Sequence, residues 1–156
     1  MIELIDPIIS SNKVDISTGL NVHYLEASNN NNNQPIALLL HGFPELSFSW
    51  RKIIPILAYE GFRVIAPDMR GYGLTSGGTK KYDTNISEYR LLNLTTDILS
   101  LISALKINKV DLLVGHDAGS SVAGTSALIR PDIFKSVVMM SAPFTGAPNI
   151  DSNLSY

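Results

Sequence analysis

An aspartate between two glycines occupies the centre of the pentapeptide GHDAG at 115–119. The apolar residues 110–114 precede it and a stretch with helical character follows it, which is the strand, tight turn and helix context of a nucleophile elbow. A Cβ on either glycine would collide with neighbouring backbone, and the turn presents the central side chain at the top of the sheet. The first amides of the helix also favour an ionised carboxylate. Asp117 is therefore a candidate nucleophile.

The same pentapeptide allows a plainer interpretation, in which Asp117 is only the N-cap of the following helix and the glycines only form the turn. A second motif favours the chemical interpretation. The sequence HGFPE at 41–45 follows directly on the apolar residues 36–40, which have the pattern of a buried strand.

Two further stretches accompany these motifs in consistent order, SWR at 49–51 and APDMRGYG at 66–73. Together the four motifs resemble those of the soluble epoxide hydrolases, which have the α/β-hydrolase fold, and the resemblance spans roughly residues 19–144. It implies that Asp117 opens an epoxide to an alkyl-enzyme ester, which water then hydrolyses to a diol. It also implies a small apolar epoxide and water as the partners, with no cofactor and no metal.

The resemblance assigns roles to residues around Asp117. It implies that the backbone N–H groups of Phe43 and Ala118 form an oxyanion hole for charge on the ester carbonyl oxygen, and that the peptide before Pro44 is cis. Phe43 and Trp50 are expected on the wall of an apolar substrate pocket, beside Ala118, and for Trp50 a place in the core is the alternative. Because Ala118 departs from the tryptophan common in the family, the substrate size is not predicted.

Other polar residues of these motifs are expected to have structural roles. His41 should hold its loop by hydrogen bonds, and His116 should be half-buried packing beside the elbow. Glu45 has no partner that the sequence can name. The turn that contains Asp68, Arg70 and Tyr72 is expected to brace the loop near the pocket.

In family order, two tyrosines of a helical cap and an acid-histidine pair follow the strand that here ends near Pro143. The six tyrosines stand at 24, 59, 72, 82, 89 and 156 and the three histidines at 23, 41 and 116, and none is assigned to these roles. The sequence therefore predicts that residues 1–156 are the N-terminal part of a single α/β-hydrolase domain, truncated before the cap and the last strands. We expect no turnover from this part alone, because a general base contributes a hundred- to ten-thousandfold.

Several other functions compete with this one. An aspartate-based dehalogenase shares the elbow, but the haloalkane and haloacid types place halide donors where this chain has Phe43 and Ala118, whose side chains donate no hydrogen bond. A serine esterase is disfavoured because the elbow residue is an aspartate. A truncated, non-catalytic binding module is a third alternative, since the cap and the late histidine are missing.

The rest of the chain predicts the elements that position these residues. Residues 14–27 should form an antiparallel hairpin, and the five asparagines at 29–33 a loop. Apolar runs at 36–40, 62–66, 110–114 and 136–140 suit strands that are buried on both faces of a mostly parallel sheet. Helices are expected at 48–59, 86–105 and 120–130, which gives an α/β class. The run 136–140 should be an exposed sheet edge.

Composition limits the remaining function classes. With 12 basic and 14 acidic residues the net charge is -2, which gives no support for nucleic-acid binding. The absence of cysteine excludes disulfides and thiolate metal sites. Residues 1–10 lack the pattern of a secretory signal, and the longest apolar run is far shorter than the ~20 residues of a membrane span. We expect a cytoplasmic protein, and the oligomeric state is not predicted.

Overall fold

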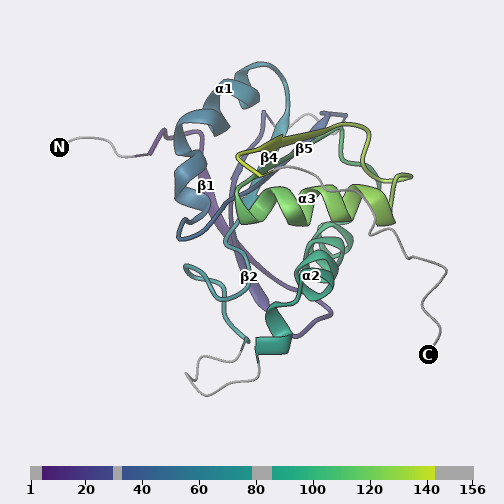
Figure 1. Ribbon diagram of the computed structural model, residues 1–156. Coiled ribbons are helices and arrows are strands. Elements are labelled where there is room, and N and C mark those ends of the chain that lie inside the picture. Colours follow the sequence, from purple (N-terminus) through teal and green to yellow (C-terminus); the bar gives the residue numbers. More distant parts are fainter. Residues whose placement is uncertain (1–4, 30–32, 79–85, 143–156) are drawn as a thin grey trace, which may run out of the picture.

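The computed structural model describes residues 5–29, 33–78 and 86–142, which fold around one mixed six-stranded sheet (Figure 1). The strands are β1 (Ser10–Asp15), β2 (Asn21–Ala27), β3 (Ile36–Leu40), β4 (Arg63–Pro67), β5 (Leu112–His116) and β6 (Val137–Met140). The helices are the 3-10 helices η1 (Ser47–Lys52) and η2 (Ile86–Tyr89) and the α-helices α1 (Ile53–Tyr59), α2 (Leu91–Ala104) and α3 (Ala118–Ile129).

The sheet has the order β1-β2-β4-β3-β5-β6. β1 pairs antiparallel with β2, which confirms the predicted hairpin, and β2 pairs antiparallel with β4. The pairs β3–β4, β3–β5 and β5–β6 are parallel, which confirms the predicted fold class. The ends of the four predicted parallel strands shift by at most two residues. Most of the predicted asparagine loop, 30–32, lies outside the described residues.

Helices cover the two faces of the sheet, and each central strand contributes to both hydrophobic clusters. In β3, Leu38 and Leu40 pack with the cluster under α2 and α3, whereas Ala37 and Leu39 pack with the cluster under α1. Figure 1 shows α2 and α3 side by side, with α1 apart from both. This burial on two faces is why the strands have no alternating polar residues.

Two predicted helices are interrupted. In place of one helix at 48–59, η1 leads into α1, and Pro55 falls in the first turn of α1, where its missing N–H has no intrahelical partner to lose. In place of one helix at 86–105, the extended backbone of Arg90 (φ -62°, ψ 145°) separates η2 from α2. Ile98 and Leu101 of α2 are buried against the sheet, but Leu91 in the first turn is 41% exposed.

β6 lies at one edge of the described sheet, as predicted. Val138 and Met140 are 44% and 41% exposed there. Ser120, at the start of α3, holds this edge against the elbow, because its Oγ lies 2.8 Å from the Met140 oxygen and accepts the Met140 N–H at 3.0 Å. Within the described residues, no helix is long and apolar enough to cross a bilayer.

Candidate active site

Asp117 stands at the sharp turn between β5 and α3. Its backbone is in a region that residues with a Cβ rarely adopt, at φ 51° and ψ -119°. A Cβ on Gly115 would lie 2.3 Å from the Gly119 oxygen, and a Cβ on Gly119 would lie 2.4 Å from the Leu40 oxygen. Both glycines are therefore required by contact with neighbouring backbone, as the sequence predicted.

The main donor to the Asp117 carboxylate comes from a neighbouring loop, and the first amide of α3 is the second. Oδ1 accepts the backbone N–H of Phe43 at 2.9 Å. The side chain makes no capping hydrogen bond to α3, which argues against Asp117 as only an N-cap. The N–H of Phe43, and next that of Ala118, hold the pKa of Asp117 below its usual range. The carboxylate is therefore ionised near neutral pH.

This lowered pKa predicts the pH dependence of the Asp117 carboxyl group. Its folded pKa is below the ordinary value of ~3.9, so the group should stay ionised as the pH falls through that value and become protonated only in more acidic solution. An NMR titration of the Asp117 carboxyl carbon measures this directly. A midpoint at or above the ordinary aspartate value would contradict the hydrogen bond from Phe43.

The buried side chain of His41, which is 1% exposed, holds the loop at 41–45 in place by hydrogen bonds. The Phe43–Pro44 peptide is cis, as the sequence comparison implied. His41 Nε2 accepts the Met69 N–H at 3.0 Å, so Nδ1 carries the proton and donates to the Gly42 oxygen at 2.9 Å. Burial lowers the pKa of His41, so it stays neutral in this role. The expected structural role of His41 is confirmed.

Glu45 and His116 connect this loop to the elbow, a link that the sequence did not predict. Glu45 Oε2 lies 2.9 Å from His116 Nδ1 and accepts the Gly42 N–H at 3.2 Å. His116 is half-buried as expected, but it is a hydrogen-bonding partner and not only packing. The pair joins the residue before Asp117 to the residue before Phe43, and so supports the bond between those two.

Asp68 is the buried centre of the turn that follows β4. Its carboxylate accepts the Ser47 N–H at 2.8 Å and the Leu74 N–H at 2.9 Å, and lies 2.7 Å from His23 Nδ1. Burial by itself would raise the pKa of Asp68, but the Leu74 and Ser47 donors outweigh it and the pKa is lowered. This agrees with the predicted bracing role.

We expect Asp68→Asn to destabilise the fold by about 3 kcal/mol, because an amide NH2 would face donors that now share a buried carboxylate. The folded pKa is depressed, so this stability should be present above the unfolded pKa of ~3.9 and lost as the pH falls through the folded pKa. Urea unfolding of both proteins measures the difference. Asp132→Asn, in an exposed pair with Arg130, is the control and should cost under ~1 kcal/mol. Equal losses would contradict a central role for Asp68.

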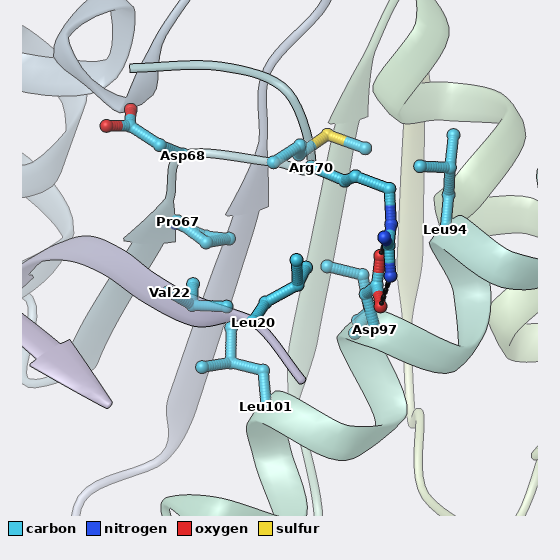
Figure 2. A pocket seen from close by; sticks show the side chains of 10 residues that line it. Leu20, Val22, Pro67, Asp68, Arg70, Leu94, Asp97 and Leu101 are labelled. Atoms are coloured by element: carbon cyan, nitrogen blue, oxygen red, sulfur yellow. Dashed lines mark hydrogen bonds and ion pairs between the residues drawn. The ribbon is translucent and has the colours of Figure 1, made fainter. Parts of the chain in front are cut away.

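Arg70, two residues after Asp68, forms an ion pair with α2. Its guanidinium donates twice to Asp97 of α2, at 2.7 and 2.8 Å, and Figure 2 shows this pair with the Asp68 carboxylate directed away from it. Both side chains are under 10% exposed, at 9% and 7%. The pair ties the turn after β4 to α2, and Thr18 of the hairpin loop adds a hydrogen bond to Asp97 at 2.6 Å.

A pocket of about 170 Å³ lies beside the elbow. Its lining includes Gly42, Ala118, Tyr72, Tyr89 and Leu94, together with His41, Met69 and Arg70. The Phe43 side chain is 70% exposed and does not line this pocket.

Trp50, for which the core was the alternative to the pocket wall, lies in the core. Its indole packs in the cluster under α1 with Ile54 and Val64, and is 7% exposed. η1 turns this side chain toward the sheet, so it contributes to the core and not to the pocket beside Ala118. Its Nε1 is buried and has no hydrogen-bond partner among the described residues.

The three histidines of the chain all lie within the described residues, and each makes its hydrogen bonds to groups other than Asp117. His23 contacts Asp68 and Ser11, His41 holds its loop, and His116 Nδ1 faces Glu45. Within the described ranges, no group of three or more acidic or histidine side chains could hold a metal ion.

Comparison with known proteins gives one family and a consistent set of relatives. Residues 35–155 match the family model described as alpha/beta hydrolase fold. The chain is 43% identical over 131 residues to an epoxide hydrolase of Caballeronia sordidicola, covering 83% of this chain and 37% of that protein. It is 40% identical over 128 residues to epoxide hydrolase B of Mycobacterium tuberculosis, covering 82% of this chain and 34% of that protein.

Solved structures agree with these relatives. An epoxide hydrolase from Vigna radiata superposes with a TM-score of 0.79 at 38% identity, over 92% of this chain and 43% of that one. Potato epoxide hydrolase I (Solanum tuberosum) superposes with a TM-score of 0.79 at 36% identity, over 91% and 43%. The chain thus spans less than half the length of the proteins it is similar to.

Proposed function

This chain belongs to the alpha/beta hydrolase fold family, and we propose that it carries the nucleophile and the oxyanion hole of an epoxide hydrolase. The observation that carries the proposal is the hydrogen bond of 2.9 Å from the Phe43 N–H to Asp117 Oδ1. It leaves the second carboxylate oxygen, Oδ2, as the atom that can attack. The similarity to named epoxide hydrolases supports an epoxide as the electrophile.

In the first step, Asp117 Oδ2 attacks an epoxide carbon, the carbon–oxygen bond of the ring breaks, and the released oxygen takes a proton from water. Oδ1 becomes the carbonyl oxygen of the resulting ester. In the second step, water adds to that carbonyl carbon and Oδ1 becomes an oxyanion. The Phe43 N–H already points at Oδ1 and the Ala118 N–H is adjacent, so both are donors for this charge. Donors of this kind contribute roughly a hundred- to a thousandfold each.

We propose that this chain completes the first step but not the second. Water attack on the ester needs a general base, which contributes roughly a hundred- to ten-thousandfold. His23 and His41 use both ring nitrogens for hydrogen bonds within the fold, and His116 is turned toward Glu45. The alkyl ester on Asp117 should therefore persist.

A comparison of three electrophiles tests the proposed substrate class. We expect styrene oxide to alkylate Asp117 at least tenfold faster than 3-phenylglycidate, because the added carboxylate is repelled by Asp117 and costly to place in the pocket. 1-Chlorobutane should react more slowly still, since the Phe43 and Ala118 side chains donate no hydrogen bond to a leaving halide. Peptide mass spectrometry gives the three rates. Faster reaction with the chloroalkane would favour a dehalogenase. No reaction at Asp117 with any of the three would favour a non-catalytic module.

A further inference from the structure

A set of serine, histidine and aspartate side chains lies where the hairpin of β1 and β2 meets the turn that follows β4. Ser11 Oγ is 2.8 Å from His23 Nε2, and His23 Nδ1 is 2.7 Å from Asp68 Oδ2. The His23 and Asp68 side chains are only 7% and 3% exposed, whereas Ser11 is exposed on the edge strand β1. In the sheet, β4 and β3 lie between β2 and the strand that leads to Asp117, so this set is separate from the elbow.

The hydrogen bonds fix the direction of proton donation along this set. Asp68 is ionised, because the backbone donors described above lower its pKa, and a carboxylate can only accept. His23 Nδ1 must therefore carry the proton that is shared with Asp68. Nε2 then has a free lone pair, so Ser11 donates its hydroxyl proton to Nε2. This is the arrangement in which a histidine acts as a general base on a serine.

Backbone contacts hold two members of the set in place. The Asp68 N–H donates to the His23 oxygen at 2.8 Å. Thr75 Oγ1 accepts the His23 N–H at 3.0 Å and donates to the Asp68 oxygen at 2.6 Å. The imidazole and the carboxylate therefore need no rearrangement when the histidine takes a proton.

We propose that Ser11 is a second nucleophile of this chain, which accepts a phosphonyl or acyl group from a small activated electrophile. With a fluorophosphonate, a bond forms between Ser11 Oγ and phosphorus and the phosphorus–fluorine bond breaks, which releases fluoride. The hydroxyl proton moves to His23 Nε2, and Asp68 stabilises the imidazolium until that proton passes to water. Because Ser11 is exposed on an edge strand, we expect it to react only with an electrophile that is already activated by a good leaving group.

The test is phosphonylation of the 156-residue chain by an alkyl fluorophosphonate, located by peptide fragmentation in a mass spectrometer. Ser10 is the internal reference, because it neighbours Ser11 on the same strand but donates its hydroxyl to the Glu26 oxygen, 3.1 Å away. We expect Ser11 to react at least about a hundredfold faster than Ser10, the lower range for general-base catalysis. Equal reaction at the two serines would overturn the proposal.

Variants test whether the fast labelling of Ser11 depends on His23 as a base or only on the exposure of the Ser11 side chain. Ser11→Ala should abolish the fast labelling, and Ser10→Ala should leave it within twofold. His23→Gln keeps a donor toward Asp68 and removes the base, so labelling of Ser11 should fall to the rate of Ser10. A thermal melt checks that each variant folds; if His23→Gln does not, the two serine variants decide the result. Fast labelling that survives in folded His23→Gln would overturn the proposal as well.

Discussion

Asp117→Asn is expected to reduce alkylation by styrene oxide by more than about a hundredfold, because loss of a nucleophile costs more than loss of a supporting group. The asparagine oxygen can still accept the Phe43 N–H, so the loop and the elbow should keep their geometry. What disappears is the anionic oxygen that attacks the epoxide carbon. The initial rate of adduct formation, measured by intact-protein mass spectrometry, gives the comparison.

Asp132→Asn is the matched control for this substitution, since Asp132 is an exposed carboxylate paired with Arg130 and lies outside the site. Its rate should equal that of the unaltered chain. A rate for Asp117→Asn within tenfold of the parent would show that another carboxylate, and not Asp117, is the nucleophile.

The second large effect is expected from Gly115→Ala, which should destabilise the fold by about 3 kcal/mol or more. The new Cβ would lie 2.3 Å from the Gly119 oxygen, 2.6 Å from the Gly119 carbonyl carbon and 2.7 Å from the Ser120 Cα. All three are backbone atoms of the elbow, so no side-chain rotation relieves the collision. The turn must open, which would also move the Asp117 carboxylate away from the Phe43 N–H.

Gly78→Ala provides a control with the same chemical change. A Cβ there would meet its nearest atom, Leu20 Cδ2, at an ordinary contact distance of 3.7 Å. Urea unfolding of the two variants should therefore show a large loss for Gly115→Ala and less than about 1 kcal/mol for Gly78→Ala. A stable Gly115→Ala protein that still reacts with styrene oxide at the parent rate would contradict the tight elbow.

The strands and the elbow were predictable from the sequence because their signals are local. Each parallel strand is a short apolar run, and GHDAG contains both the glycines that the turn requires and the residue that the turn presents. The hairpin was predictable for the same reason, since a turn sequence separates its two strands.

Contacts between distant parts of the chain were not predictable in this way. Glu45 and His116 are 71 residues apart, and no local pattern tells which carboxylate a histidine will meet. The sequence left Trp50 either in the core or on the pocket wall, and the 3-10 helix η1 directs it into the core. For His23 the sequence did contain a signal, because a histidine between the apolar strand residues Val22 and Tyr24 needs a buried partner, which is Asp68.

If Asp117 forms a covalent ester with an epoxide, the ester can be located on the protein itself. The chain is incubated with styrene oxide, digested, and searched by fragmentation mass spectrometry for the residue that carries the added mass. We expect an adduct on Asp117, about a hundredfold above any exposed carboxylate and stable over the digestion, because no histidine of the chain is placed to activate water for its hydrolysis. An adduct spread evenly over surface carboxylates, with Asp117 unmodified, would contradict it.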